Sequence, residues 1–120
     1  MNRRQFGELG ETIAARALER SGLRIVARNV RYPEGEIDIV AEDGDTLVFV
    51  EVRSRRGAAF GTPEESVTPR KRARLVSAAH RFLDEHGRAE TDWRIDLIAV
   101  ELAHDGRLLR VEHFRSVVEG

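Results

Sequence analysis

An alternating stretch of apolar and polar residues, a tight turn and a second apolar stretch most restrict how this chain can fold. The first stretch is residues 36–42, the turn is Asp43-Gly44-Asp45, and the second stretch is residues 46–53. This pattern predicts an antiparallel hairpin. Because successive side chains of a strand lie on opposite faces, one face of the hairpin is entirely apolar and is expected to face the core. Its members are Ile37, Ile39, Ala41, Val48, Val50 and Val52.

The other face of the hairpin gathers acidic side chains. A two-residue turn at Gly44-Asp45 places Asp38 opposite Glu51, and a turn one residue earlier places Glu36 opposite Glu51. In both registers Asp38 and Glu51 share a face. Opposed carboxylates repel each other, and a divalent cation bound between them would remove that repulsion. Carboxylate ligands suit Mg²⁺, Mn²⁺ or Ca²⁺. The alternative is a solvent-facing strand surface whose charges Arg53 pairs.

The rest of the chain predicts two helices and three further strands. The helix between the third and fourth strands permits a parallel crossover, so we expect a mixed sheet. In the first helix, Gly7 and Gly10 lie on the buried side, where they would let the helix approach its neighbour closely. The length fits a single domain, residues 1–120. The predicted elements are helix 3–21, strand 23–31, the two hairpin strands, helix 69–86, strand 93–102 and strand 108–114.

Several classes of protein are excluded by what the sequence lacks. There is no cysteine, which excludes disulfides, thiolate metal sites and cysteine nucleophiles. No apolar run approaches the length of a membrane span, and the first residues carry no apolar signal region. We therefore expect a cytoplasmic protein without a membrane partner. The four histidines show no ligand spacing and are expected at the surface.

The charge of the chain is unevenly distributed. The net charge is −1, but residues 53–74 alone carry a net charge of +5. A basic segment on a neutral protein is a candidate contact for a polyanion, and we expect Arg55, Arg56, Lys71 and Arg74 to contact nucleic acid. The alternative is a solvated arginine-rich loop. Lys71 is the only lysine among the 20 basic residues, and it precedes Leu75 by one helical turn, on the expected buried stripe.

Several motifs resemble those of known families. Glu51-Val52-Arg53, after Asp38, resembles the Asp…Glu-x-Lys signature of the PD-(D/E)XK nuclease superfamily. The chain also resembles the YraN family of small bacterial proteins, which is similar in layout to archaeal Holliday-junction resolvases. This resemblance implies an α/β fold with a mixed central sheet flanked by helices, a restriction-endonuclease-like core in the order αβββαββ. It rests on Gly10-Glu11, residues 35–38 and 49–55, Phe60-Gly61, Lys71 and residues 94–96.

The same resemblance implies roles for individual residues. Glu11, Asp38 and Glu51 would ligate Mg²⁺ or Mn²⁺, with the carbonyl of Val52 as a further ligand. Arg53 occupies the position of the catalytic lysine of the superfamily. Because arginine stays protonated, it can stabilise phosphate charge but cannot act as a base. Asp96 also matches the family, and we expect a structural role for it.

These features predict a metal-dependent, nuclease-like protein that acts on DNA phosphodiesters, in branched or damaged structures. Two alternatives on the same fold stay open. The first is a catalytically inactive nucleic-acid-binding module, which Arg53 indicates. The second is a protein-interaction adaptor, which the near-neutral charge and the aromatic content of 6% favour slightly. The sequence also leaves a homodimer open.

Overall fold

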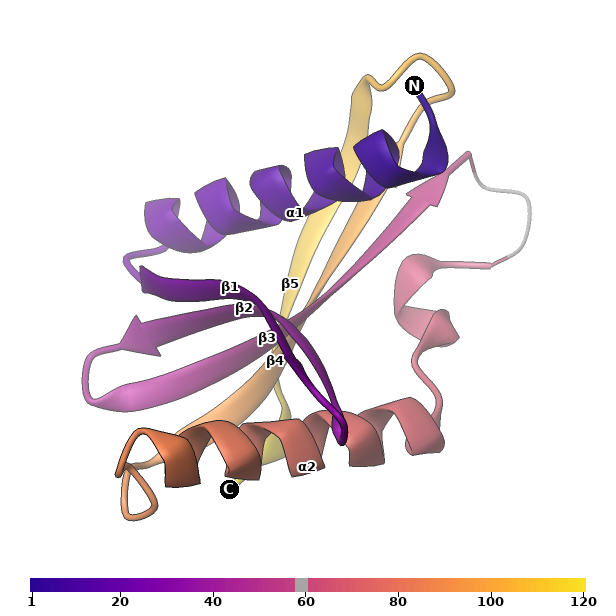
Figure 1. Ribbon diagram of the computed structural model, residues 1–120. Coiled ribbons are helices and arrows are strands. Elements are labelled where there is room, and N and C mark those ends of the chain that lie inside the picture. Colours follow the sequence, from indigo (N-terminus) through magenta and orange to yellow (C-terminus); the bar gives the residue numbers. More distant parts are fainter. Residues whose placement is uncertain (58–60) are drawn as a thin grey trace.

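The computed structural model describes residues 1–57 and 61–120, and these ranges contain two α-helices, one 3₁₀ helix and five strands (Figure 1). The order of helix, three strands, helix and two strands is as predicted, and Phe60 lies outside the described residues. None of the described helices is long and apolar enough to cross a membrane. The elements are α1 (Arg3–Arg20), β1 (Arg24–Tyr32), β2 (Gly35–Asp43), β3 (Thr46–Arg56), η1 (Pro63–Ser66), α2 (Pro69–Glu85), β4 (Trp93–Leu102) and β5 (Leu108–Glu119).

Local signals in the sequence determine where both α-helices begin. The side chain of Asn2 accepts a hydrogen bond from the amide of Gln5, and the Gln5 side chain accepts one from the amide of Asn2, which forms a capping box. At α2, the hydroxyl of Thr68 accepts a hydrogen bond from the amide of Lys71 (3.2 Å), and proline follows at the first helical position. The predicted start of α2 is therefore confirmed.

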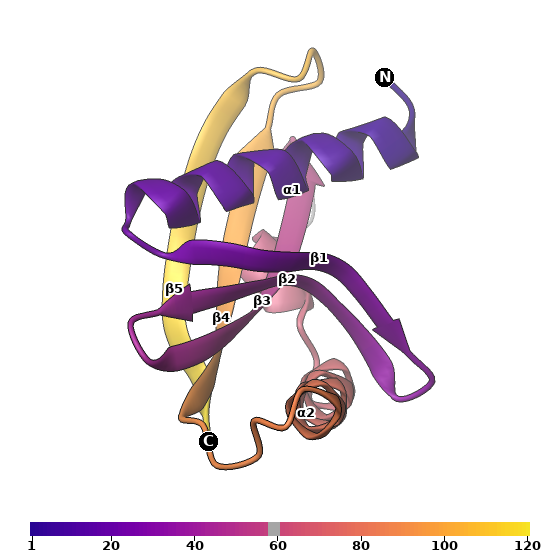
Figure 2. The ribbon, with the colours of Figure 1, turned by 60° about the vertical axis from the view of Figure 1, so that its left-hand side comes forward.

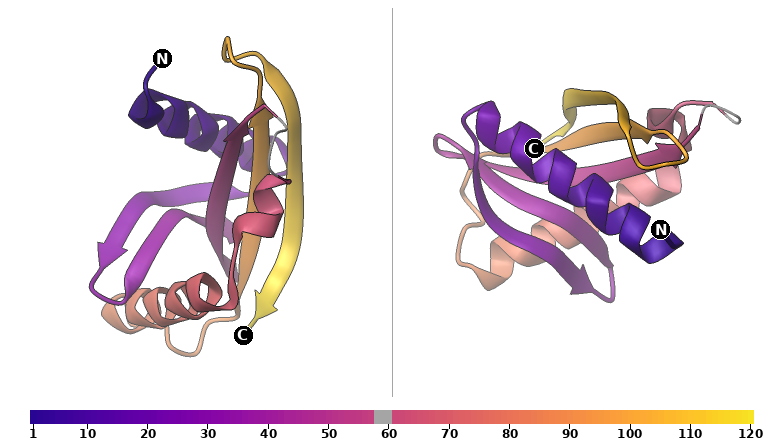
Figure 3. Two further views of the ribbon diagram at one scale, coloured as in Figure 1. Left: turned by 90° about the vertical axis from the view of Figure 1, so that its right-hand side faces the viewer. Right: turned by 90° about the horizontal axis from the view of Figure 1, so that it is seen from above.

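The five strands form one mixed sheet in the order β1-β2-β3-β4-β5. β3 and β4 are parallel and are connected through α2, whereas the other neighbouring strands are antiparallel. The predicted mixed sheet is therefore confirmed. A parallel pair requires a long crossover connection, and α2 supplies it. α1 covers one face of the sheet and α2 covers part of the other (Figure 3).

Each face of the sheet carries its own hydrophobic core. On the α1 side, Val48 and Val50 of β3 pack with Ala14 and Leu18 of the helix. On the α2 side, Phe49 of β3 contacts the helix, and its ring meets that of Phe82 edge to face at 5.7 Å. The predicted buried stripe of α2 is confirmed in full: Leu75, Ala78, Ala79, Phe82 and Leu83.

β2 and β3 pair with each other only near their turn. Asp43 lies opposite Thr46, which gives the two-residue turn at Gly44-Asp45, and the pairing ends where Ile39 lies opposite Val50. Beyond this point β2 stays paired with β1, while β3 continues along β4. The β1–β2 hairpin therefore curves away from β3 and toward α2 (Figure 2).

This divergence corrects one part of the predicted core. Ile37 was expected on the same apolar face as Ile39 and Val50, which pack toward α1. Instead Ile37 is buried in the core beneath α2, because β2 bends and twists between Ile37 and Ile39 once it leaves β3. The alternation of apolar and polar residues in the sequence does not predict this bend.

The tip of the β1–β2 hairpin is attached to α2. Gly35 lies so close to the helix that a Cβ at this position would stand 2.6 Å from the carbonyl oxygen of Arg74. Beside it, the guanidinium of Arg81 donates to both carboxylate oxygens of Glu34, at 3.2 and 3.0 Å. A glycine in the hairpin turn and an ion pair at its tip thus hold the hairpin on α2.

Two strands are longer than predicted. β3 continues to Arg56, because residues 53–56 stay in register with β4, and the predicted loop from Ser54 therefore begins only after Arg56. β5 continues past Phe114 to Glu119 through a bulge near Ser116, whose φ is 55°. A bulge on an edge strand has no simple sequence signature, so the prediction stopped too early.

Gly10 and Gly7 provide a matched test of the packing of α1. A Cβ on Gly10 would overlap the side chain of Ser54, whereas a Cβ on Gly7 would meet nothing within 4 Å. The close approach expected of both glycines is thus confirmed for Gly10 only. We expect Gly10→Ala to lower the free energy of unfolding by about 1–3 kcal/mol and Gly7→Ala to raise it by about 0.5–1 kcal/mol. Urea denaturation measures both, and Ser54→Gly should restore most of the loss in Gly10→Ala; two equal effects would contradict the packing.

Candidate functional site

The divergence of β2 from β3 opens a pocket of about 300 Å³ on the α2 side of the sheet. Carboxylates from both strands lie along one part of its wall, and cations from β3 and α2 lie along another. The pocket therefore combines groups that bind cations with groups that bind anions. Its lining residues are Glu36, Asp38, Glu51, Val52, Arg53, Lys71, Arg74 and Leu75.

Asp38 occupies the place where the β2–β3 pairing ends. The register would next bring Asp38 opposite Glu51 and then Ile37 opposite Val52, but the strands separate after Ile39 and Val50. The carboxylate of Asp38 instead accepts a hydrogen bond from the backbone N–H of Val52 at 2.8 Å. A side chain of β2 thus satisfies a backbone donor of β3 that would otherwise lose its partner.

Asp38 and Glu51 form a pair of neighbouring carboxyl groups. The side chain of Glu51 is 18% exposed, and a hydrogen bond joins its carboxyl group to that of Asp38. Burial, followed by the negative charge of Asp38 and this hydrogen bond, raises the pKa of Glu51 to about 8. Burial likewise raises the pKa of Asp38. The structure brings the two residues together in the lining of one pocket, and their raised pKa values favour a proton on the pair.

Arg53 and Lys71 are both held by η1. The Nε of Arg53 donates to the Oγ of Ser66 at 2.8 Å, and its Nη1 lies 4.0 Å from Oε1 of Glu51. The Nζ of Lys71 donates to the carbonyl of Ser66 at 3.4 Å. Sequence reasoning missed Ser66, because only the path of the connection between β3 and α2 brings it beside two cations.

The four predicted nucleic-acid contacts divide into two pairs. Lys71 and Arg74 line the carboxylate pocket, but Lys71 is exposed, so its expected place on the buried stripe of α2 is wrong. Arg55 and Arg56 lie outside this pocket. Arg55 is level with Glu101 of β4, and Arg56 stacks over Phe6 of α1 at 4.5 Å from the ring centre. The strand alternation sends Arg56 to the α1 side of the sheet.

Glu11 approaches the site from α1. Its carboxylate lies 3.7 Å from Arg28 of β1, and burial, followed by the charge of Asp38, raises its pKa. The charges of Glu11 and Asp38 therefore influence each other across the split. Over residues 1–57 and 61–120, however, no three His, Cys, Asp or Glu side chains are close enough together to hold a metal. The roles of Glu11 and of the Val52 carbonyl as ligands stay predictions.

The Asp38–Glu51 pair has the chemistry of a divalent-cation site. Two half-buried carboxyl groups this close repel each other when both ionise, and a bound cation would remove that repulsion. All the side-chain donors are hard oxygen ligands, which suit Mg²⁺ or Mn²⁺. The residues present therefore fit a cation bound by Asp38 and Glu51.

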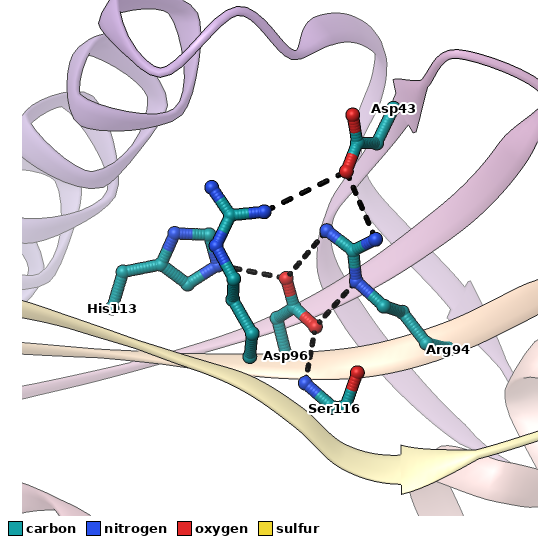
Figure 4. A network of polar contacts seen from close by, with 6 residues as sticks. Asp43, Arg94, Asp96, His113 and Ser116 are labelled. Atoms are coloured by element: carbon teal, nitrogen blue, oxygen red, sulfur yellow. Dashed lines mark hydrogen bonds and ion pairs between the residues drawn. The ribbon is translucent and has the colours of Figure 1, made fainter.

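A second polar cluster surrounds Asp96 on the opposite face of the sheet (Figure 4). Asp96 is fully buried and accepts hydrogen bonds from Arg94 (3.0 Å) and from the Ser116 amide (2.8 Å), while a ring nitrogen of His113 lies 2.7 Å from its other oxygen. Burial would raise the pKa of Asp96, but these hydrogen bonds hold it below the ordinary value. The expected surface position of His113 is wrong, since its side chain is 16% exposed.

This network joins strands rather than lining the pocket. Asp96 is level with Val50 of β3, which faces α1, whereas Glu51 faces the other way. Arg94 also donates to Asp43 at the end of β2 (2.9 Å). The contacts of Asp96 thus connect β4 with β5 and β2, which agrees with the structural role expected for it.

The fold and the pocket define a mixed α/β protein whose sheet splits around a half-buried pair of carboxyl groups. Residues 10–100 match the family model described as "Uncharacterised protein family UPF0102". The chain is 51% identical over 112 residues to a UPF0102 protein of Beutenbergia cavernae, covering 93% of this chain and 94% of the relative. It is 46% identical over 114 residues to one of Pelotomaculum thermopropionicum, covering 95% of each. The chain belongs to the UPF0102 family, the YraN-like family that its motifs resemble.

The shared proton predicts a dependence of stability on pH. The native pKa of Glu51, about 8, exceeds the value of 4.5 expected for an unfolded chain, so the native state binds more protons between these values. This contribution to the free energy of unfolding is complete below pH 4.5 and is lost as pH rises through 8. Relative to Glu51→Gln, the wild type should lose a few kcal/mol between pH 5 and 9, since one pKa unit is worth about 1.4 kcal/mol. Urea titrations in EDTA measure this; parallel pH curves would contradict the shared proton.

Proposed function

We propose that this protein is a metal-dependent, nuclease-like protein that acts on phosphodiesters of DNA. One observation carries the proposal: the Asp38–Glu51 pair and three basic residues line the same pocket. These basic residues are Arg53, Lys71 and Arg74. A phosphodiester bound to a divalent cation needs both parts, carboxylates for the cation and basic side chains for the phosphate oxygens. Branched or damaged DNA is the substrate class that the resemblance to resolvases suggests.

The residues of the pocket divide this chemistry between them. Asp38 and Glu51 would hold Mg²⁺ or Mn²⁺ once their shared proton leaves, and the cation would polarise a phosphate and lower the pKa of a bound water. Arg53, held by Ser66 at 2.8 Å, presents a fixed guanidinium to a phosphate. Lys71 and Arg74 add positive charge from the first turns of α2.

The proposal places the chain with the PD-(D/E)XK nucleases. The resemblance of residues 38 and 51–53 supports it, as does the order of the elements, αβββαββ. The position of the Asp38–Glu51 pair at a split between two strands gives those two motif residues a shared pocket. A cytoplasmic protein with access to DNA is the setting that this function requires.

A nucleic-acid-binding module without catalysis is the second candidate, and Arg53 favours it. A lysine at this position can lose its proton when buried, whereas an arginine cannot. The Nε of Arg53 also donates to Ser66, which fixes the guanidinium as a group that binds phosphate. In this candidate the same cations bind a phosphate backbone and the carboxyl pair only orients them.

Cation binding and DNA cleavage test the two candidates separately. We expect calorimetry to detect Mn²⁺ binding to the wild type, and Asp38→Asn and Glu51→Gln each to abolish it, because each removes a charged ligand. We also expect Mn²⁺-dependent cleavage of flapped or four-way DNA by the wild type, reduced at least 100-fold in Asp38→Asn. Asp45→Asn, an exposed acid in the hairpin turn, is the matched control.

The outcomes separate the candidates clearly. Binding of Mn²⁺ and DNA without cleavage supports the binding module and rejects the nuclease. Equal Mn²⁺ binding by the wild type, Asp38→Asn and Glu51→Gln rejects the cation site. Cleavage that Asp38→Asn retains in full rejects the proposed catalytic pocket.

Lys71 gives a further prediction about the pocket. Its ammonium group is compact and bonds to the carbonyl of Ser66, a geometry that the planar guanidinium of arginine does not reproduce. We expect Lys71→Arg to weaken DNA binding or cleavage about as much as Lys71→Ala, with normal folding in both. Full activity in Lys71→Arg would show that only positive charge is needed there. Arg72→Lys, on the same helix outside the pocket, is the control.

A further inference from the structure

Two more grooves lie on the α1 side of the split and join the carboxylate pocket. The first, of about 460 Å³, shares Val52 and Arg53 with that pocket and also contains Glu11 and Gly7. The second, of about 490 Å³, shares Glu11, Gly7 and Arg3 with the first and extends to β1. The two grooves adjoin each other along the N-terminal half of α1, and the first also adjoins the carboxylate pocket at Val52 and Arg53. We call the two together the α1 groove.

The α1 groove is basic, although four of its five arginines belong to segments outside the basic stretch of the sequence. Five arginines and two glutamates line it, for a net charge of +3. Arg3 forms no ion pair among residues 1–57 and 61–120, and Arg28 meets Glu11 only at 3.7 Å. Arg31 lies 3.3 Å from Glu36, which itself lines the carboxylate pocket. The five arginines are Arg3, Arg4, Arg28, Arg31 and Arg53.

Gly7 is an independent sign that the groove is kept open. It lies within α1, where glycine costs helix stability relative to alanine. Packing does not explain that cost, because a Cβ at this position would meet nothing within 4 Å, in contrast to Gly10. Gly7 lines both parts of the α1 groove, so its missing side chain leaves bare helix backbone facing the open space.

We propose that the α1 groove binds the sugar-phosphate backbone of a nucleic-acid strand that continues past the carboxylate pocket. The inference rests on the proposed function. It narrows the substrate to a polymer that has several further phosphates on the α1 side of the phosphate that reacts in the carboxylate pocket. A mononucleotide or a terminal phosphate would fill the carboxylate pocket and bring no phosphate to the arginines of the α1 groove. Arg53, which lines both the pocket and the groove, is the point where the strand passes between them.

The experiment measures the binding of single-stranded and duplex DNA of increasing length by fluorescence anisotropy in EDTA, at several salt concentrations. We expect Arg3→Ala and Arg31→Ala each to weaken binding of a long probe about 3- to 10-fold and to reduce the salt slope by about 1. Neither should change the binding of a probe of two or three nucleotides. Gly7→Leu, which fills the groove with a good helix former, should act in the same way. Arg16→Ala, exposed on α1 outside the groove, is the matched control.

Each outcome decides the inference. One outcome is that the wild type binds DNA in a salt-dependent way and that the three groove variants, Arg3→Ala, Arg31→Ala and Gly7→Leu, bind as tightly as Arg16→Ala. This outcome overturns the α1 groove and keeps the proposed function. Equal losses of affinity for short and long probes also overturn the α1 groove. The substitutions would then affect DNA binding only through the carboxylate pocket, which a short probe already fills. A wild type that binds no DNA at 50 mM salt overturns both the groove and the nucleic-acid function, whereas the Mn²⁺ titration still reports on the cation site.

Discussion

The separation of β2 from β3 after Ile39 and Val50 is the constraint on which the rest of the site depends. Had the two strands stayed paired, Asp38 and Glu51 would lie on a continuous sheet surface with no space between them and α2. Because they separate, the carboxylate of Asp38 bonds to the amide of Val52, and the opening becomes a pocket. The ion pair of Arg81 with Glu34 holds the hairpin against α2, so the fold stabilises the separated arrangement.

The burial of two acids in that opening has a cost that the protein does not offset by a simple ion pair. Arg53 is 4.0 Å from Glu51 at its nearest, and burial still raises the pKa of Glu51 to about 8. Asp96 shows the contrasting case, a fully buried carboxylate whose hydrogen bonds keep its pKa low. One acid is satisfied by its surroundings and the other is not, which is the difference expected between a structural carboxylate and one placed to bind a ligand.

Sequence reasoning was successful where local periodicity decides the structure. The hairpin at residues 36–53, the buried stripe of α2 and the mixed sheet all follow from strand and helix periods, and the structure selects one of the two hairpin registers that the sequence left open. It failed where long-range geometry decides. The bend that moves Ile37 to the other core, the bulge at Ser116 and the placement of Ser66 beside two cations depend on contacts between distant segments.

The distribution of arginine shows that sequence reasoning also misses functional charges that only the fold brings together. The sequence drew attention to residues 53–74 because their charges are adjacent along the chain, yet Arg56 lies on the α1 side of the sheet beside Phe6. Arg3 and Arg31 are separated by the whole of α1 in the sequence but line one groove. Since a polyanion responds to charges that are close in space, the arginines that the fold gathers around the split count together, and the basic segment of the sequence supplies only part of them.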